Sequence, residues 1–388
     1  MNKNVFLDYI DNYNVEDVQS SLENAFSMLN LNNVVKPKMK VLIKVCLADT
    51  VSSDSAINTH PSVVRAIVNI FSKMGVKCVV ADSPYKKHTR TYLDQAYLNS
   101  GLLEVANLTP CELNRNLKVC EIETPNGVAT KKLTLLDIIN EVDLIVNVGK
   151  IKVDEELGYL GACSNIFGLV PGEKKTQILN RLLTQQDFNN YNLDILQAIK
   201  DKLAINILDG IVALEANKTP RMLYCLGVSE NPYSLDAAVL DILGIKYENT
   251  ILKQSEDRNL FSLEKPYKNL HKQIEDFKLQ DFALTTINCN ALLNKDEGSR
   301  KKYFNANQAR PTIKCKTCKG CSICSKLCPT KAISMKYDGN GELYAEINYD
   351  KCIFCNKCII GCPYDVVENK VPIGYKKLEK EINKYNEE

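Results

Sequence analysis

Two matching runs of cysteines near the C-terminal end constrain this sequence more than any other feature. Each run has the form Cys-x-x-Cys-x-x-Cys-x-x-x-Cys-Pro, first from Cys318 to Pro329 and again from Cys352 to Pro363. Three thiolates with this spacing can wrap one face of a [4Fe-4S] cluster, while the fourth cysteine, followed by proline, is directed to the other cluster of a pair. The spacing therefore predicts two clusters that exchange one ligand each.

The exchange defines two sets of cluster ligands. The sets are Cys318, Cys321, Cys324 and Cys362, and Cys352, Cys355, Cys358 and Cys328. The two runs repeat with a period of 34 residues, and a short apolar stretch follows each of them. A zinc site is the alternative, but zinc usually takes its thiolates from two separated pairs and not from one run of four. A disulfide framework is less favoured, because the chain is long and shows no secretory signal.

Cys315 offers a second way to align the first run. It lies three residues before Cys318, so that a triplet could begin at either cysteine. Only the alignment from Cys318 to Cys328 reproduces the second run with its Cys-Pro ending. We therefore predict that Cys315 is a spare thiol, and a redox or ligand role for it stays open.

The charge of the chain gives no support for a nucleic-acid or membrane-surface partner. Its 388 residues include 49 lysines and arginines and 47 acidic residues, a formal charge of +2. Residues 311–370 hold nine lysines and six acidic residues. Because each oxidised cluster with its thiolates contributes about −2, a loaded module is close to neutral. The lysines are interpreted as compensation for the clusters.

The N-terminus has no positively charged segment followed by an apolar core, and no apolar run approaches the roughly 20 residues that span a bilayer. Eight of the 16 cysteines lie outside the predicted ligand sets, which fits a reducing compartment. The sequence therefore predicts a cytoplasmic location, with no membrane partner.

The part before the cysteine runs alternates between apolar strand patterns and helical patterns. Strands are predicted at 40–47, 76–81, 142–148 and 204–208, and helices at 61–74, 193–203 and 234–243. The helix at 61–74 follows Thr59 and His60, begins with proline and is followed by Gly75, which are ordinary start and stop signals. Strand, helix and strand in this order build a parallel sheet. We predict an α/β fold with a mostly parallel sheet flanked by helices, joined to a small α+β module like a bacterial ferredoxin.

Polar residues lie in or just after the predicted strands. In open α/β sheets ligands bind beyond the carboxyl ends of the strands, so these residues are expected to share one crevice. The candidate catalytic residues are Lys44, Asp82, Lys152 and Asp209, and the candidate cofactor-binding residues are Lys150, Asn165 and Lys174. The lysines would bind an anionic group, and the carboxylates would act as general acids or bases. The alternative is that these are ordinary turn and cap residues.

Glycines gather in the stretch from Gly158 to Lys175. Its four glycines allow close backbone approach, but neither GxxxxGK[ST] nor GxGxxG occurs in it. It is interpreted either as a loop that cradles a ligand, with Lys174 or Lys175 for an anion, or as a glycine-rich hairpin with solvated lysines. His60 is predicted to cap the following helix, with a general-acid role beside Asp82 as the alternative.

The chain resembles the family known as domain of unknown function 362, which is often joined to a C-terminal module with two [4Fe-4S] clusters. The resemblance rests on short segments in a fixed order, at 42–45, 59–61, 81–84, 150–152, 165–175, 209–215 and 235–237. This chain differs where the family usually has Asn, His and Lys, because it has Cys46, Asp154 and Ser164. The resemblance implies an architecture and a redox association, but no reaction.

Together these features predict a low-potential iron-sulfur redox protein, interpreted as an oxidoreductase of unassigned reaction. Its ferredoxin module would pass single electrons to or from a site in the α/β domain, and its partner would be a redox protein or a small-molecule acceptor. A flavin or other organic cofactor could mediate, although no motif selects one. The alternative is an electron-transfer or assembly adaptor without catalysis. The predicted domains are 1–308, 309–370 and an amphipathic helical segment at 371–388.

Overall fold

The computed structural model describes residues 2–85, 88–154, 157–179, 181–182, 184–277, 282, 310–328, 330–349, 351–352 and 357–370. The chain divides into two compact units, Met1–Lys175 with Thr184–Thr285, and Thr176–Leu183 with Thr286–Glu388. No described helix is both long enough and apolar enough to cross a membrane.

A mixed sheet forms the centre of the larger unit. Among the described residues it has nine strands in the order β11-β1-β10-β9-β7-β2-β3-β4, with β8 paired to β7. The strands are β1 (Asn4–Tyr9), β2 (Lys40–Val45), β3 (Lys77–Ala81), β4 (Cys111–Leu113), β7 (Leu144–Asp154), β8 (Gly158–Leu160), β9 (Leu203–Leu214), β10 (Pro220–Ser229) and β11 (Lys268–Asn269). Neighbours from β4 to β9 run parallel, whereas β10 is antiparallel to both β9 and β1. The predicted fold class, a mostly parallel sheet flanked by helices, is confirmed.

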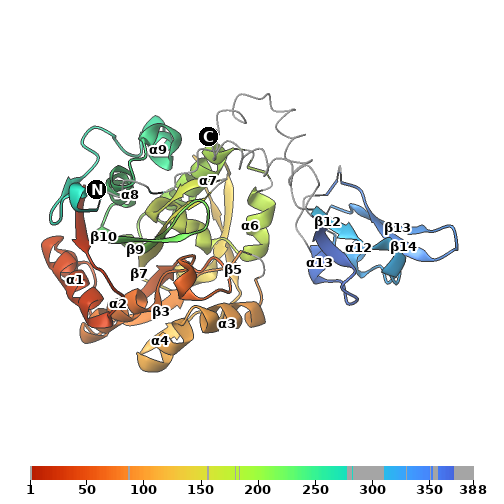
Figure 1. Ribbon diagram of the computed structural model, residues 1–388, viewed down its shortest axis with the longest axis horizontal. Coiled ribbons are helices and arrows are strands. Elements are labelled where there is room, and N and C mark those ends of the chain that lie inside the picture. The colour runs from red at the N-terminus through yellow and green to blue at the C-terminus, as the bar shows by residue number, and fades with distance from the viewer. Residues whose placement is uncertain are drawn as a thin grey trace. The chain divides into compact units, whose positions relative to one another are not determined.

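Helices cover both faces of this sheet (Figure 1). One group, seen below the sheet in this view, consists of α1 (Val15–Met28), α2 (Pro61–Lys73), α3 (Arg90–Asn99) and α4 (Leu102–Leu108). The other face carries α7 (Gln185–Ile199), α8 (Pro232–Ile242) and α9 (Ile251–Asp257). The short helix α5 (Ala162–Asn165) contacts α7 and α8. Because both faces are covered, β2 is buried along nearly its whole length, as expected of a strand in a parallel sheet.

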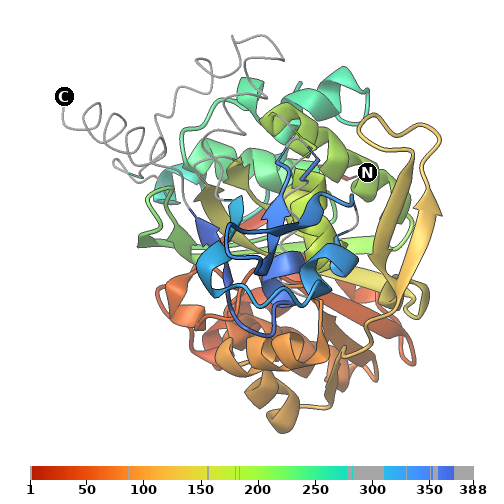
Figure 2. The same cartoon turned by 90° about the vertical axis from the view of Figure 1, so that its right-hand side faces the viewer.

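Two strands stand apart from the main sheet. β5 (Val119–Glu123) and β6 (Lys132–Leu136) form an antiparallel hairpin, seen as a long two-stranded arm in Figure 2. The turn of this arm is fixed by Asp194, whose carboxylate accepts hydrogen bonds from the backbone of Val128, Ala129 and Thr130 at 2.8–3.0 Å. The arm is therefore fastened to α7.

The helix predicted at 61–74 is α2, and its start is as expected. His60 is the N-cap, and its Nδ1 accepts a hydrogen bond from the Ser62 backbone at 3.2 Å. Pro61 occupies the first turn, and Gly75 follows the helix with a φ of +72°. The predicted capping role of His60 agrees with this geometry.

Three local predictions were wrong. Lys150 and Lys152 do not follow a strand, because β7 continues to Asp154, and Asp209 likewise lies within β9. The helix predicted at 193–203 is α7, which begins at Gln185 because Thr184 and Asp187 form a capping box before it. The stretch from Gly158 to Lys175 is not a loop, and only its first three residues belong to a hairpin, in which β8 pairs antiparallel with β7. It contains β8, α5, the short 3₁₀ helix η4 (Ile166–Leu169) and the beginning of α6 (Gly172–Leu179).

The smaller unit has the predicted ferredoxin-like α+β character. Its elements are β12 (Arg310–Ile313), the 3₁₀ turn η7 (Cys315–Thr317), α12 (Ile323–Leu327), β13 (Ile333–Tyr337), β14 (Leu343–Ile347), α13 (Lys357–Ile360) and β15 (Val367–Lys370). β12 pairs with β15 and β13 with β14, both antiparallel. Each cysteine run contains one short helix and leads into a strand, so the repeat in sequence is a repeat in structure. Cys355 and the segment 371–388 lie outside the described residues.

Candidate functional site

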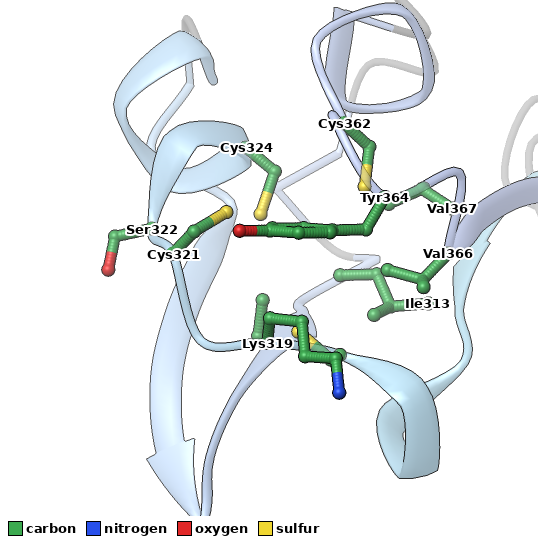
Figure 3. A pocket seen from close by; sticks show the side chains of 11 residues that line it. Ile313, Lys319, Cys321, Ser322, Cys324, Cys362, Tyr364, Val366 and Val367 are labelled. Atoms are coloured by element: carbon green, nitrogen blue, oxygen red, sulfur yellow. The ribbon is translucent and has the colours of Figure 1, made fainter.

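Four cysteines from both runs line a single cavity in the smaller unit (Figure 3). We call it the first cysteine cavity, and its thiols belong to Cys318, Cys321, Cys324 and Cys362. Its other walls are mainly apolar and include Ile313, Ala345, Val366 and Val367. The cavity therefore groups the first predicted ligand set, including the cysteine that comes from the second run.

Local backbone geometry brings these cysteines together. Gly320 has a φ of +61°, and a Cβ on it would lie 2.6 Å from the Leu343 carbonyl oxygen. Glycine is thus required in the turn between Cys318 and Cys321. Cys324 lies in α12, while Cys362 comes from the turn before β15. Two separate chain segments must be in place before the set is complete.

The described members of the second ligand set pack in the core of the same unit. Cys358 is buried in this core with Ile333 and Ile347, and the partly buried Cys328 and Cys352 pack against it. The backbone N–H of Ala332 donates to Cys328 Sγ at 3.2 Å. Hydrogen bonds to cysteine sulfur are among the groups that tune the potential of an iron-sulfur cluster.

Cys315 is placed differently. It is exposed in η7, it does not line the first cysteine cavity, and its Sγ lies 3.6 Å from the Ile313 carbonyl oxygen. This position agrees with the alignment that begins at Cys318. Four thiols around one largely apolar space fit a [4Fe-4S] cluster, which would supply one-electron chemistry when bound.

In the larger unit, the first pair of candidate residues forms a buried ion pair. Lys44 Nζ lies 2.8 Å from Asp82 Oδ2, and the same oxygen accepts the Leu47 backbone N–H at 3.1 Å. Lys44 also donates to the Val45 carbonyl oxygen at 2.6 Å. Lys44 is fully buried and Asp82 is 4% exposed. Both charged groups are therefore satisfied within the chain.

A second lysine approaches the same carboxylate. Lys175 Nζ is 3.8 Å from Asp82 Oδ1, donates to the Ser83 carbonyl oxygen and lies over the rings of Tyr85 and Phe167. Burial lowers the pKa of Lys175 to about 8. Its neighbour Lys174 instead donates to Thr134 Oγ1 in β6 at 2.8 Å. Of the two lysines considered for an anion, only Lys175 is thus placed beside a candidate residue.

In the stretch from Gly158 to Lys175, position 168 requires glycine for lack of space. A Cβ on Gly168 would collide with Lys44 Nζ and with both carboxylate oxygens of Asp82. Its carbonyl oxygen also accepts the Ser83 backbone N–H at 3.0 Å. The glycines were predicted to let the backbone approach a ligand. At Gly168 the backbone instead approaches the Lys44–Asp82 ion pair.

The remaining candidate pair lies on the neighbouring strands β7 and β9. Lys150 and Asp209 are register partners, and Lys150 Nζ is 2.9 Å from Asp209 Oδ2. Tyr13 joins them, because its hydroxyl donates to Asp209 Oδ1 and accepts from Lys150 Nζ, each at 2.7 Å. The ring of Tyr13 stacks on His60 at 3.6 Å. This second group is also enclosed, with Lys150 2% and Asp209 0% exposed.

Burial shifts the titration of this group. It lowers the pKa of Lys150, an effect that the attraction of Asp209 opposes. It also lowers the pKa of His60 to about 4, so that the imidazole is neutral near pH 7. The pKa of Tyr13 is raised by burial and by the nearby Asp209 carboxylate, and its hydroxyl therefore stays protonated.

The other two candidates contact different partners. Lys152, which is partly exposed, donates to Cys46 Sγ and to the Ile57 carbonyl oxygen, both at 3.1 Å. Asn165 donates to Asn147 Oδ1 at 2.8 Å, and Asn147 donates to Asn206 Oδ1 at 3.0 Å. Asn165 thus begins a row of amide hydrogen bonds across β7 and β9. Among the predicted lysines and carboxylates, Lys152 and Lys174 are partly exposed, whereas the other four are buried.

Sequence reasoning missed two polar residues of these networks, the partly buried Tyr13 and the fully buried Asp236. Tyr13 lies just before α1 in a stretch without any recognisable motif, so nothing in the sequence pointed to it. Asp236 accepts the backbone N–H groups of Ala162 and Cys163 and the Tyr159 hydroxyl at 2.7–3.0 Å. In the sequence, Asp236 is marked only by the segment 235–237, one of those on which the family resemblance rests. Gly161 provides the space, since a Cβ there would collide with Asp236 and Tyr159.

Comparison with known families decides how the chain is classified. The model of the domain of unknown function DUF362 matches residues 41–241, which is more than half of the chain. This chain belongs to the DUF362 family. A second model, described as a 4Fe-4S dicluster domain, matches residues 317–366. The DUF362 chain therefore carries a ferredoxin-type iron-sulfur module for electron transfer.

Two relatives are similar to parts of this DUF362 protein. A thylakoid-associated protein of Synechocystis sp. is 26% identical over 250 residues, covering 63% of this chain and 75% of the relative. NADH-quinone oxidoreductase subunit I of Pelobacter propionicus is 30% identical over 84 residues, which cover 18% of this chain and 45% of that subunit. The chain thus spans less than half of the length of the second relative.

Proposed function

We propose that this DUF362 protein is a low-potential redox protein with two [4Fe-4S] clusters. Its module passes single electrons to or from a substrate or cofactor site in the DUF362 domain. The observation that carries the proposal is the first cysteine cavity, where thiols from two distant runs face one space. The similarity to a subunit named for an oxidoreductase supports a relay role.

The two units would have different roles, because the cysteines of the smaller unit are engaged as cluster ligands. With all eight predicted thiolates engaged, neither cluster has an open ligand position, so substrate chemistry would belong to the DUF362 domain. There Lys44, Asp82, Lys150 and Asp209 form the buried framework. Lys152 and Lys174 are the charged candidates with solvent access, and Lys152 is proposed to contact the anionic group of a ligand.

The test begins with protein purified under strict anaerobiosis. About eight iron and eight labile sulfide per chain are expected, and reduction should give the signals of two interacting paramagnets. Small molecules that co-purify are then identified by mass spectrometry in wild type, Lys152→Ala and the exposed control Lys73→Ala. A compound retained by wild type and Lys73→Ala but lost from Lys152→Ala, at equal iron content, supports a ligand site. Zinc without sulfide would overturn the cluster assignment.

The second candidate function is an electron-transfer or assembly adaptor without catalysis. The observation in its favour is that four charged candidates satisfy one another in two ion pairs and are at most 4% exposed, namely Lys44, Asp82, Lys150 and Asp209. On this proposal the DUF362 domain docks a redox enzyme and the clusters relay its electrons. Retention of no compound by any of the three proteins, with full cluster content and electron transfer intact, would favour the adaptor.

A further inference from the structure

The first cysteine run lies in an unusually basic stretch. Between Ile313 and Tyr337 the chain has six lysines and neither aspartate nor glutamate. The six are Lys314, Lys316, Lys319, Lys326, Lys331 and Lys336. In contrast, residues 350–370 around the second run mix three lysines with Asp350, Asp365 and Glu368. Positive charge is therefore concentrated around the first cysteine run, which supplies three ligands of one predicted cluster and Cys328 to the other.

Most of these lysines are available to a partner. Lys314 pairs with Glu368 at 2.7 Å, and Lys336 pairs with Glu346. Lys316, Lys319, Lys326 and Lys331 are exposed and form no ion pair with another described residue. They come from η7, the Gly320 turn, α12 and the turn before β13, which also carry the first run of cysteines.

Exposed apolar side chains accompany this charge. Ile323 and Leu327 lie four residues apart in α12 and therefore share a face, and they are 37% and 43% exposed. Tyr364, which lines the first cysteine cavity, is 52% exposed, and Figure 3 shows its ring reaching between the cysteines. Cys321 is itself exposed. An electron at this cavity is therefore close to the surface.

We propose that this lysine-rich surface docks an acidic electron-transfer protein. An apolar centre with a charged rim is the usual anatomy of a protein interface, and complementary charge speeds the encounter of redox partners. Compensation of cluster charge alone would place lysines beside both runs alike, whereas the acid-free stretch surrounds only the first. The inference rests on the proposed relay function and adds the chemistry of the partner and the cluster through which electrons cross.

The experiment uses the full chain with both clusters, reduced by dithionite without oxygen. Its oxidation is followed by stopped flow with an acidic flavodoxin, with basic cytochrome c and with a neutral benzoquinone. We expect the flavodoxin rate to fall about tenfold or more as salt rises, and the cytochrome c rate to rise. Lys316→Glu combined with Lys326→Glu should lower the low-salt flavodoxin rate by a similar factor, because neither side chain lines the cavity.

The matched control carries the same change in net charge on the other unit. Lys73→Glu with Lys77→Glu, both at exposed positions, should leave the flavodoxin rate within about twofold. Equal flavodoxin rates in the two double variants at equal iron content would overturn the proposed surface. A wild-type protein with full clusters that reduces none of the three oxidants would instead overturn the relay function itself.

Discussion

The two units of this DUF362 protein treat their chemically active side chains in opposite ways. In the smaller unit, four thiols from distant parts of the chain face a shared cavity. In the larger unit, lysines and carboxylates from neighbouring strands face one another and are buried. A set of groups that faces a common space requires something from outside the chain, whereas a set that satisfies itself is part of the fold. Position at the carboxyl end of a sheet does not distinguish these cases, but contact geometry does.

The largest expected effect comes from the cysteine cavity. Cys324→Ser should remove one cluster, and the iron content should fall from about eight to about four per chain or lower if the module fails to assemble. Iron and labile sulfide analysis under anaerobiosis measures this. Cys315→Ser is the control and should keep about eight iron. A similar loss in both variants would mean that Cys315 is a ligand and that the alignment of the first run is wrong.

The buried pair on β7 and β9 should matter mainly for stability. Lys150→Met leaves Asp209 buried without its cation, and we expect a loss of about 3–5 kcal/mol in the free energy of unfolding. Urea denaturation measures it. Lys73→Met, which breaks an exposed pair with Glu23, should cost less than about 1 kcal/mol. If Lys150→Met is as stable as wild type, the pair does not stabilise the fold. Lys150 and Asp209 would then be grouped with the residues that bind a ligand.

Glycine at position 168 tests how tightly the other ion pair is enclosed. Gly168→Ala would press a methyl group onto Lys44 and Asp82, and the expected cost is about 1–3 kcal/mol. Gly339→Ala in the turn between β13 and β14 meets no atom within 4 Å and should be nearly neutral. Thermal unfolding of the two variants side by side measures the difference. Equal midpoints would indicate that the space above Lys44 is open and could admit a ligand.

The last effect is a dependence of stability on pH, which is spread over more than two pH units. The pKa of His60 is about 4 in the folded chain against an ordinary value of 6.5, so the unfolded chain binds the extra proton between these values. Stability is therefore lost as the pH falls from 6.5 toward 4, by up to about 1.4 kcal/mol per pH unit. His60→Asn keeps a capping side chain but does not titrate, and should flatten this part of the urea-midpoint profile. Parallel profiles would contradict the enclosed position of His60.

The sequence allowed good prediction where periodicity or spacing carried the information. The pattern around Pro61 located α2, and the apolar runs located the buried strands, because both patterns follow from which face is covered. The extent of β7 and β9 could not be predicted in this way. Lys150 and Asp209 are polar, but each neutralises the other inside the sheet, so the strands continue through them.

Long-range packing decided the rest of the candidate site. Lys174 and Lys175 are adjacent in sequence, and only their positions on α6 turn one toward Thr134 and the other toward Asp82. Tyr13 reaches Asp209 across 196 positions of sequence. No local pattern encodes such a contact.

The pairing of β12 with β15 has a consequence for how the iron-sulfur module can be handled. Arg310 and Lys370 are register partners, so the chain enters and leaves the module at adjacent points of one two-stranded ribbon. The first and last residues of this segment are therefore neighbours in space. The module could be grafted into a surface turn of another protein without stretching either end, and its iron content there would report its folding.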